Sequence, residues 1–451
     1  MDLKDAREKI DNIDCKISKL LDERAKVVKD IALFKAVNGM DIFDSARESE
    51  KLDAIDSPEK RRIFERIMEV SRDSQKLTYG LLGKHLSHSF SKDIHERYFG
   101  YSYEYFQLDE KDLPSFFKNR RFKGINVTIP YKKEVIKYLD ELTDEAREIG
   151  SVNLVLNEGG KLKGYNTDIY GFRRLLEKVP DFESAVILGD GGASACVKYA
   201  LKGKKVKVLG RKELGQYEGA DLVVNATPCG MFPNVDEVPV DISNCKAVID
   251  LVYNPYRTEL MLNASEKGIT AIGGLEMLFY QAIGAKELFT GEKLSPLEEA
   301  LLYDRFEREY MNIALIGMPG SGKSTFGKKL AKDLGKTFVD LDDEIYSREG
   351  QTAEEIILFR GEDAFRDIET KVLGEISLRH NAVISTGGGI VERDENRRLL
   401  LRNSNIWYLK RDLEDLEVFG RPLSMEKGVE KLFEERGEKY QAWSQYIIEE
   451  E

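Results

Sequence analysis

Residues 317–324 constrain this chain more than any other segment, because they match the phosphate-loop pattern G-x-x-x-x-G-K-[ST] at every fixed position. An apolar run at 313–316 precedes them and a predicted helix at 326–334 follows, which is the strand–loop–helix context that the pattern requires. The glycines let the backbone wrap a polyphosphate, and N–H groups at the helix start point at it. A chance glycine-rich turn is the alternative, which this context disfavours. We expect nucleotide phosphates at Gly320, Ser321, Gly322, Lys323, Ser324 and Thr325, with the Ser324 hydroxyl on Mg²⁺.

Length and charge limit the partners of the chain. Its 451 residues suggest about three domains of ~150 residues each. A net charge of -12 argues against nucleic acid or an anionic membrane as the main partner, so small anionic ligands need local cationic pockets. The four cysteines lie far apart in the sequence, which favours the reducing cytoplasm over a disulfide scaffold.

Changes in composition divide the chain into modules. Residues 1–76 are highly charged and predict an all-α helical bundle. Short apolar runs broken by glycine and proline then predict an α/β substrate domain at about 77–180 and a Rossmann domain at about 181–291. We interpret the charged stretch 292–310 as a linker helix and 311–451 as an α/β phosphate-loop domain. No repeat relates the modules, so the chain is predicted to be multidomain.

Two acids follow the phosphate loop at the predicted end of a strand. Asp340 and Asp342 are two residues apart, so we expect both on one side of that end, one for the metal and one for the acceptor hydroxyl. A predicted helix carries Phe-Arg-Asp-Ile-Glu at 365–369, and a strand at 381–386 runs into Gly-Gly-Gly at 387–389. Backbone N–H groups of such a turn approach a ligand closely.

Together with DLDDEI, FRDIE, TGGG, RPL at 421–423 and Glu435-Arg436, the loop resembles shikimate kinase, over the full module and in the family's order. The resemblance implies that Asp342 accepts the proton of the reacting hydroxyl and that Asp340 lies near Mg²⁺. The substrate carboxylate would be held by Arg366, Gly388 and Arg436, and Arg421 would reach the phosphates from a lid. Transfer to another small polyol acid is the alternative, which Asp342 with the two arginines disfavours.

The strand predicted at 185–188 enters a turn, Gly189-Asp190-Gly191-Gly192-Ala193, of the dinucleotide-binding type. It departs from G-x-G-x-x-G, so a plain strand–helix turn remains an alternative. The next strand ends in Gly210-Arg211-Lys212, where a basic residue favours the 2′-phosphate of NADP. We expect the pyrophosphate at Gly189, Gly191, Gly192 and Ala193, and the 2′-phosphate at Arg211 and Lys212.

Polar motifs before this turn provide groups for a polyhydroxylated ligand. A lysine and an acid near a carbonyl suit proton transfer coupled to hydride transfer. The motifs NVTIPYK at 126–132, SVN at 151–153, YNTD at 165–168 and YNP at 253–255 resemble shikimate dehydrogenase over 78–291. The resemblance implies a catalytic pair, Lys132 and Asp168. It also implies a shikimate site lined by Ser87, Ser89, Thr128, Asn153, Tyr253 and Gln281.

The N-terminal module has a seam that alternates steps of three and four residues. It runs through Arg7, Ile10, Asp14, Ile17, Leu21, Arg24, Val28, Ile31 and Lys35 on one long helix. Cations on an apolar seam are costly unless they meet anions. A bundle interior that binds a dianion would satisfy them, whereas the seam alone favours a coiled coil with snorkelling ends.

With Asp44, Arg47, Glu48, Ser71 and Gln75, residues 1–76 resemble the all-helical chorismate mutase family. The resemblance implies a homodimer in which Arg24 and the partner subunit's Arg7 bind two carboxylates. Lys35 and Gln75 would meet the ether oxygen, Glu48 with Asp44 the ring hydroxyl, and Arg47 and Ser71 would complete the pocket. Preorganised charge would catalyse this pericyclic reaction without a cofactor.

The sequence thus predicts a cytoplasmic enzyme that uses NADP, ATP and Mg²⁺ on small molecules. We expect it to reduce 3-dehydroshikimate, to phosphorylate shikimate and to rearrange chorismate to prephenate. The alternative for residues 1–76 is a regulatory sensor of chorismate or prephenate.

Overall fold

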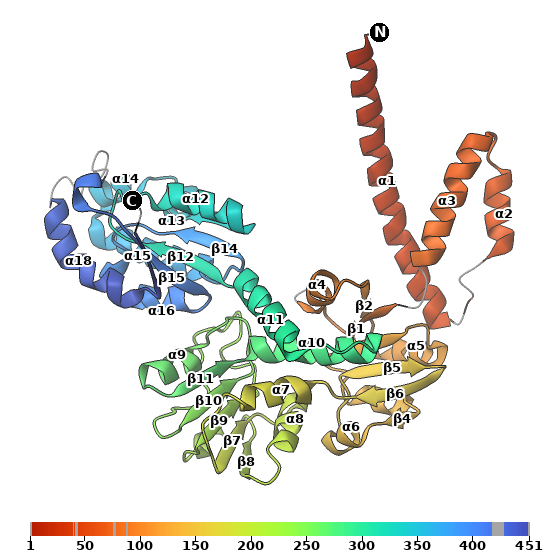
Figure 1. The fold of residues 1–451 in the computed structure, drawn as a ribbon, viewed down its shortest axis with the longest axis horizontal. Coiled ribbons are helices and arrows are strands. Elements are labelled where there is room, and N and C mark those ends of the chain that lie inside the picture. The colour runs from red at the N-terminus through yellow and green to blue at the C-terminus, as the bar shows by residue number, and fades with distance from the viewer. Residues whose placement is uncertain are drawn as a thin grey trace. The chain divides into compact units, whose positions relative to one another are not determined.

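The computed structural model describes residues 2–38, 40, 44–74, 78–86, 89–416 and 428–449. The chain forms two compact units (Figure 1). The first contains Met1–Ile169 with Gln281–Lys293, and the second Tyr170–Tyr280 with Leu294–Glu451. The predicted roles of Gln75, Ser87 and Arg421 fall outside the described residues.

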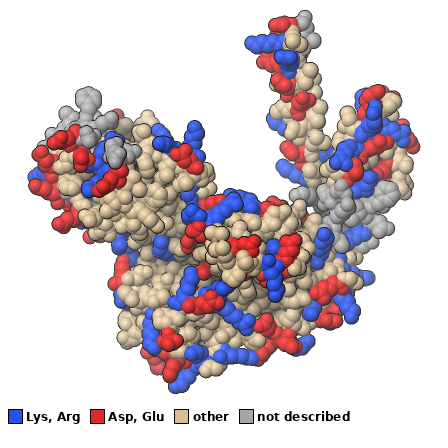
Figure 2. All heavy atoms as spheres, in the orientation of Figure 1, with Lys and Arg blue, Asp and Glu red and all other residues tan. Residues whose placement is uncertain are grey.

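The first unit begins with the predicted helices, α1 (Leu3–Asn38), α2 (Ser45–Asp53) and α3 (Pro58–Ser74). The predicted seam lies on the single helix α1, which is about 54 Å long at 1.5 Å per residue. Most of the apolar seam residues are exposed, including Ile10, Ile17 and Leu21, whereas Val28 is buried. Figure 2 shows acidic and basic side chains interleaved with other residues along α1. An apolar seam of this length is typical of a helix that pairs with another helix.

The rest of the first unit is built on a six-stranded mixed sheet in the order β2-β1-β3-β5-β6-β4. The strands are β1 (Tyr79–Gly83), β2 (Tyr103–Gln107), β3 (Gly124–Val127), β4 (Glu141–Leu142), β5 (Leu154–Glu158) and β6 (Lys161–Tyr165). β5 runs antiparallel to both β3 and β6, so its first residues lie at the edge where β3 and β6 end. That edge carries the polar motifs predicted from the sequence. The helices α5 (Leu113–Asn119) and α6 (Asp144–Ile149) belong to the same unit as this sheet.

The second unit contains two parallel sheets. The first is five-stranded in the order β11-β10-β9-β7-β8, a doubly wound arrangement whose strand order reverses between β7 and β9, which is consistent with the predicted nucleotide-binding domain. Its strands are β7 (Ser184–Leu188), β8 (Lys205–Leu209), β9 (Leu222–Asn225), β10 (Ala247–Asp250) and β11 (Thr270–Gly273). Its helices are α8 (Gly192–Ala200) and α9 (Glu259–Glu266), together with those parts of α7 (Asp168–Leu176) and α10 (Gly274–Thr290) that belong to the second unit. The three inner strands, β7, β9 and β10, are fully or largely buried and rich in valine, isoleucine and leucine, as a parallel sheet covered on both faces requires, whereas the edge strands β8 and β11 are partly exposed.

The predicted linker helix is α11 (Pro296–Tyr310), and it packs against the nucleotide domain. The Phe306 ring stacks on Phe279 of α10, with 4.9 Å between ring centroids. Glu299 is buried, accepts a hydrogen bond from the Tyr170 hydroxyl at 2.6 Å and pairs with Arg174. A helix that buries an aromatic face and a carboxylate is an integral part of the fold. The interpretation as a linker is therefore incomplete.

The last sheet is also five-stranded and parallel, in the order β13-β14-β12-β15-β16. Its strands are β12 (Asn312–Ile316), β13 (Thr337–Asp340), β14 (Ala382–Ser385), β15 (Ser404–Lys410) and β16 (Tyr446–Glu449). Its helices are α12 (Lys323–Leu334), α13 (Leu341–Glu349), α14 (Ala353–Arg360), α15 (Glu362–Ile376), α16 (Glu395–Leu401) and α18 (Val429–Trp443). Every residue of β12 is buried, which fixes the position of the phosphate loop that follows it. Within the described residues, no helix is both long and apolar enough to cross a membrane.

Candidate active sites

The structure brings together the two residues predicted to be catalytic in the first unit. Lys132 Nζ lies 2.6 Å from Asp168 Oδ2. Lys132 comes shortly after β3, and Asp168 follows β6 as the first residue of α7. Their side chains are 23% and 10% exposed, so the pair is largely shielded and still open on one side. This geometry suits proton exchange with a bound ligand.

Asn153 holds the acid of this pair in place. Its Nδ2 donates to Asp168 Oδ1 at 2.8 Å and to Thr167 Oγ1 at 3.0 Å, and its Oδ1 accepts from the Thr167 backbone N–H at 2.6 Å. Asn153 lies directly before β5, at the edge of the sheet where β5 begins and β3 and β6 end. Because both Asp168 oxygens have partners, its carboxylate has one orientation toward Lys132.

Other predicted residues of this site lie at the same edge. Thr128 directly follows β3, and its backbone N–H donates to Leu82 O at 2.9 Å. A Cβ on Gly83 would lie 2.7 Å from Thr128 Cγ2, so only glycine permits this approach. Ser89 is half-buried, and its carbonyl accepts from the Tyr105 hydroxyl at 2.7 Å. Gln281 lies on α10 in the first unit, and Tyr253 follows β10 in the second.

The glycine turn after β7 has the features of a pyrophosphate site. Gly189 has φ 102°, and its N–H donates to Leu209 O at 2.7 Å. Gly191 is the N-cap of α8 and carries no side chain to cap the helix, so N–H groups at the helix start remain available to an anion. Gly192 and Ala193 are the first residues of α8. The donor set fits a dinucleotide pyrophosphate.

Two exposed cations follow β8, where the sequence predicts the 2′-phosphate of the cofactor. Arg211 and Lys212 are both exposed at the end of that strand. Acids flank the same turn: Glu213 Oε2 accepts from the Gly210 N–H at 3.0 Å, and a Cβ on Gly210 would lie 3.5 Å from Asp190 Oδ2. The two cations offset these carboxylates, so the site still fits a phosphorylated ribose.

The phosphate loop adopts a cradle whose shape depends on glycine. Gly317, Gly320 and Gly322 have φ 149°, 86° and 85°, a region that side-chain-bearing residues rarely adopt. Lys323 Nζ lies across the loop and donates to the carbonyls of Gly317 at 2.9 Å and Met318 at 2.8 Å. The predicted loop geometry is present, and its ammonium group and helix N-terminus fit a nucleotide polyphosphate.

The acids near this loop are placed differently from the prediction. Asp340 ends β13 and caps α13, whereas Asp342 lies in the first turn of α13, so they do not share one side of a strand end. The capping bond from the Asp342 N–H to Asp340 Oδ1, at 3.1 Å, starts the helix. The Ser324 hydroxyl donates to Asp340 Oδ2 at 2.6 Å, an oxygen pair that fits Mg²⁺ shared with phosphates.

Asp342 is exposed when the whole residue is considered, but the pKa of its carboxyl group is raised. Loss of solvent around the carboxyl is the largest cause that raises its pKa above the ordinary value, and repulsion by Asp340 adds to it. Lys323 and Arg366 act in the opposite direction. A carboxylate with a raised pKa accepts a proton more readily, which suits a base for a hydroxyl group.

The two arginines predicted to hold a carboxylate share one acid. Arg366 and Arg436 are both buried, and both pair with Glu392. Arg366 Nη1 also lies 2.7 Å from Glu369 Oε2, which orients the guanidinium group. The Nε–H groups of both arginines are buried and donate no hydrogen bond within the described residues. Two arginines with unused N–H donors can bind a carboxylate, and we call Arg366 and Arg436 the carboxylate seat.

The triple glycine shapes this seat. A Cβ on Gly389 would lie 2.0 Å from Arg366 Nη2, and one on Gly388 would lie 2.5 Å from Pro319 Cγ of the phosphate loop. The Gly388 carbonyl accepts a hydrogen bond from the Tyr440 hydroxyl. Glycine therefore lets the carboxylate seat and the phosphate loop approach each other closely.

The helical module brings together part of its predicted set. The Arg24 guanidinium donates to the Ser71 hydroxyl, which joins α1 to α3. Asp44 caps α2 by accepting from the Arg47 N–H at 3.0 Å, while the Arg47 side chain is exposed. Lys35 is half-buried near the end of α1. Arg7 is 17 residues before Arg24, roughly 25 Å along the helix, so one chain does not bring both to one site.

Sequence reasoning missed three residues of these sites. Arg72 pairs with Glu48, which ties α3 to α2. Glu392 pairs with both arginines of the carboxylate seat. Arg411, directly after β15, lies against the phosphate loop, since a Cβ on Gly322 would be 3.7 Å from its Nη1. The position of Arg411 directly after a strand next to β12 was a usable signal for it, whereas no motif indicated the others.

Known proteins match three parts of the chain. The family model for chorismate mutase type II matches residues 6–76, that for the shikimate dehydrogenase substrate binding domain matches 81–155, and that for shikimate kinase matches 319–451. A shikimate dehydrogenase (NADP(+)) from Clostridium beijerinckii is 37% identical over 267 residues, which cover 51% of this chain and 98% of that protein. The enzyme of the same name from Halothermothrix orenii is 37% identical over 288 residues, covering 52% and 99%.

A solved structure has a related sequence. It is a chorismate mutase/shikimate 5-dehydrogenase fusion protein from Clostridium acetobutylicum, 33% identical, with a TM-score of 0.47. The match covers 52% of this chain and 97% of that one. The relatives at 37% identity are matched almost from end to end. The chain therefore belongs to the shikimate dehydrogenase family, and it is a multidomain enzyme with a chorismate mutase type II region before the dehydrogenase and a shikimate kinase region after it.

Proposed function

We propose that the chain catalyses two consecutive reactions on one ring acid, the NADPH-dependent reduction of 3-dehydroshikimate and the ATP-dependent phosphorylation of shikimate at its 3-hydroxyl. The observation that carries this proposal is the Lys132–Asp168 pair in a chain that also holds the Arg366–Arg436 carboxylate seat beside a phosphate loop. The product of the first reaction is the substrate of the second. We propose the modules at 1–76, 77–291 and 311–451, joined by 292–310.

In the reduction, NADPH supplies the hydride when it is bound. Lys132 Nζ donates the proton that the carbonyl oxygen takes up, because its ammonium group is open to the ligand side of the pair. Asp168 orients this ammonium group, and Asn153 keeps the Asp168 carboxylate in position. Ser87, Ser89, Thr128, Tyr253 and Gln281 would bind the ring substituents. Arg211 and Lys212 would select NADP over NAD by charge.

In the phosphorylation, ATP supplies the phosphoryl group and Mg²⁺ neutralises phosphate charge when they are bound. Asp342 accepts the hydroxyl proton, consistent with its raised pKa. Arg366 and Arg436 hold the ring carboxylate, and Lys323 offsets phosphate charge. Ser324 and Asp340 would hold Mg²⁺. Arg411 adds a further cation at the loop, and Arg421 would contribute from the lid.

For residues 1–76 we propose rearrangement of chorismate to prephenate by a homodimer. The exposed apolar seam of α1 supports the dimer, because a partner helix would bury it. The distance between Arg7 and Arg24 supports a site shared between subunits. Lys35 and Gln75 would meet the ether oxygen, where negative charge develops. We further propose the cytoplasm as the compartment, since the cysteines are widely spaced in the sequence.

A sensor of chorismate or prephenate is the second candidate for residues 1–76. The Glu48–Arg72 ion pair favours it, because this pair occupies the carboxylate that the mutase would use for the ring hydroxyl. Mutase turnover by the purified chain, lost in Arg24→Ala, supports catalysis. Binding of prephenate without turnover, together with a change in dehydrogenase or kinase rates, would support the sensor.

The proposed function is tested by assaying the three reactions separately on the purified chain. We expect NADP-linked oxidation of shikimate, ATP-dependent phosphorylation of shikimate and formation of prephenate from chorismate. Light scattering of the same sample measures the mass, which the proposal places at twice that of one chain. Absence of either shikimate reaction would refute the corresponding assignment, and a monomer with full mutase activity would refute the shared site.

A further inference from the structure

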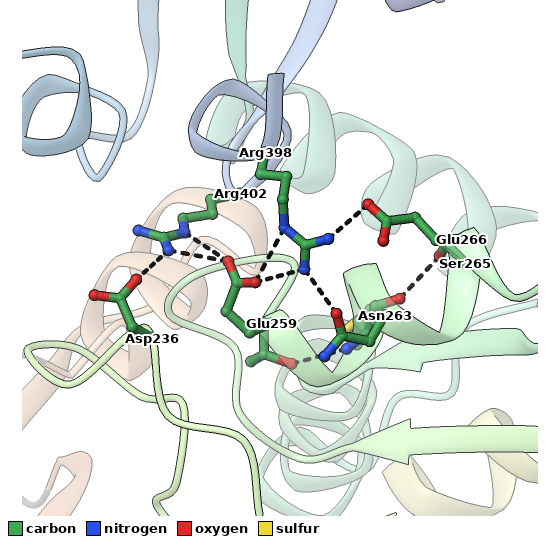
Figure 3. Close-up of polar contacts among 9 residues, drawn as sticks. Asp236, Glu259, Asn263, Ser265, Glu266, Arg398 and Arg402 are labelled. Carbon is green, nitrogen blue, oxygen red and sulfur yellow. Dashed lines mark hydrogen bonds and ion pairs between the residues drawn. The ribbon is translucent and has the colours of Figure 1, made fainter. Parts of the chain in front are cut away.

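The kinase region makes a network of ion pairs with the nucleotide domain of the dehydrogenase inside the second unit. Arg398 Nη2 lies 2.6 Å from Glu259 Oε2, and Arg402 Nη2 lies 2.9 Å from Glu259 Oε1 (Figure 3). Arg398 also pairs with Glu266 Oε1 at 2.6 Å and donates to Asn263 Oδ1 at 2.8 Å. Asn263 and Glu266 follow Glu259 by four and seven residues, so the three side chains lie on one face of α9. The two arginines are four residues apart and likewise lie on one side of the chain at α16.

The centre of this network is shielded from water. The side chains of Glu259 and Arg402 are 12% and 7% exposed. Exposed ion pairs contribute little to stability, whereas removing one partner of a buried pair leaves a charge without compensation and is strongly destabilising. The network therefore holds the kinase helix α16 and the dehydrogenase helix α9 in one arrangement.

Backbone groups just before α9 are held by the same part of the kinase region. The Tyr256 N–H donates to Asn403 Oδ1 at 2.7 Å, and the Arg257 N–H donates to Arg402 O at 2.8 Å. Arg257 Nη1 donates to Leu401 O at 2.8 Å. The bond from Arg257 N–H to Arg402 O joins backbone to backbone and does not depend on a side-chain rotamer, whereas each of the other two uses one side chain.

The segment held in this way, residues 251–258, also carries Tyr253. The Tyr310 hydroxyl, at the end of α11, donates to Tyr253 O at 2.8 Å. Tyr253 lies just beyond the carboxyl end of β10, and ligands of open parallel sheets bind outside such strand ends. At the other end of the segment, the Thr258 hydroxyl caps α9 and donates to Asp250 Oδ2 at 2.6 Å.

We propose that α11 and the kinase region together brace residues 251–258 of the dehydrogenase, so that Tyr310 of α11 and Arg402 and Asn403 of the kinase region act as positioning residues for Tyr253. This inference rests on the proposed function only for the role of Tyr253 in the shikimate site. The brace makes the dehydrogenase depend on the kinase region for its substrate affinity. The kinase region is thus a structural component of the dehydrogenase as well as a second enzyme.

The test uses the full chain with two variants of different severity and a matched control. Tyr310→Phe removes only the hydroxyl, which donates to Tyr253 O and also lies 3.4 Å from His380 Nε2, and Arg398→Ala removes the ion pairs to Glu259 and Glu266. Arg397→Ala is the control, because Arg397 lies on the same helix and its side chain makes no ion pair or hydrogen bond within the described residues. Hydrogen exchange of the amides at 251–258 is measured together with dehydrogenase and kinase kinetics.

We expect faster exchange at 251–258 in both variants. The KM for shikimate in the dehydrogenase reaction should be about fivefold higher in Tyr310→Phe, because about one hydrogen bond to Tyr253 is lost, and at least as high in Arg398→Ala, which loses several polar contacts, with kcat little changed in both. Kinase constants and the Arg397→Ala control should match the unmodified chain. Exchange at 251–258 equal to the control in both variants would overturn the brace. If the unmodified chain lacks dehydrogenase activity, the proposed function fails, while the exchange measurement still decides the brace.

Discussion

Glu392 Oε2 lies 2.9 Å from Arg366 Nε, yet the Arg366 Nε–H makes no hydrogen bond within the described residues. The carboxylate is close enough for charge attraction but is not aligned with the donor. Glu362 and Glu369 also pair with Arg366, at 3.3 Å and 2.7 Å. Glu392 therefore neutralises the two arginines and accepts a hydrogen bond from Arg436 Nη2 but leaves the Arg366 Nε–H without one, and we interpret it as an internal substitute for the substrate carboxylate.

The first prediction concerns this substitute. Glu392→Gln keeps the shape of the side chain and removes its charge, so a substrate carboxylate no longer competes with it for Arg366 and Arg436. We expect the kinase KM for shikimate to fall by up to about fivefold with kcat little changed, corresponding to about 1 kcal/mol for a partly exposed ion pair. Glu395→Gln, which removes a nearby exposed charge, is the control. A higher KM in Glu392→Gln would mean that Glu392 assists substrate binding.

The second prediction concerns the dehydrogenase pair. Lys132→Ala removes the group that exchanges a proton with the substrate oxygen, so kcat for NADP-linked shikimate oxidation should fall at least about a hundredfold. Kinase activity of the same sample should be unchanged, which reports an intact fold. The adjacent exposed lysine provides the control, Lys133→Ala. Retention of most of the turnover by Lys132→Ala would remove Lys132 from the catalytic role.

The third prediction concerns the choice of cofactor. Arg211→Ala removes an exposed cation from the end of β8, so the KM for NADP should rise about tenfold, as expected for one charge-assisted hydrogen bond. The KM for NAD should stay the same, because NAD lacks the 2′-phosphate. Steady-state kinetics with both cofactors check this. An unmodified chain that uses NAD as well as NADP would contradict the charge argument.

The sequence predicted local features better than distant pairings. The phosphate loop, the glycine turn after β7 and the long helix α1 follow from residue spacing, and the structure has all three. Asp342 was misplaced because a strand and a helix meet between it and Asp340, and the prediction overlooked Asp340 as the N-cap whose local hydrogen bond starts that helix. The Glu392 contacts and the α9–α16 network join residues far apart in the chain, and no local spacing encodes them.

The fourth prediction concerns pH and Asp250, which is fully buried at the end of β10. It accepts hydrogen bonds from Thr258, Asn225 and the Val252 N–H, but loss of solvent dominates and raises its pKa to about 7. The unfolded chain releases this proton at about pH 4, so between about pH 4 and about pH 7 the folded state binds more protons. The free energy of unfolding should therefore fall through this window as pH rises, by up to about 1.4 kcal/mol per pH unit.

Asp250→Asn removes this titration while keeping a polar group of the same size. The variant should become steadily more stable relative to the unmodified chain as pH rises toward about 7, and the difference should level off above it. Urea unfolding of both chains across this range measures the difference. A difference that does not change with pH would show that Asp250 does not titrate in this window.

The central claim is that one chain converts 3-dehydroshikimate into shikimate 3-phosphate. The direct measurement is a single reaction with the purified chain, 3-dehydroshikimate, NADPH, ATP and Mg²⁺, followed by NADPH loss and by product analysis. We predict equal amounts of NADPH consumed and shikimate 3-phosphate formed. The Lys132→Ala variant should form neither shikimate nor shikimate 3-phosphate from 3-dehydroshikimate, but it should phosphorylate added shikimate. The Asp342→Asn variant should reduce 3-dehydroshikimate to shikimate and form no shikimate 3-phosphate. NADPH consumption without any shikimate 3-phosphate in the unmodified chain, or no NADPH consumption at all, would contradict the account.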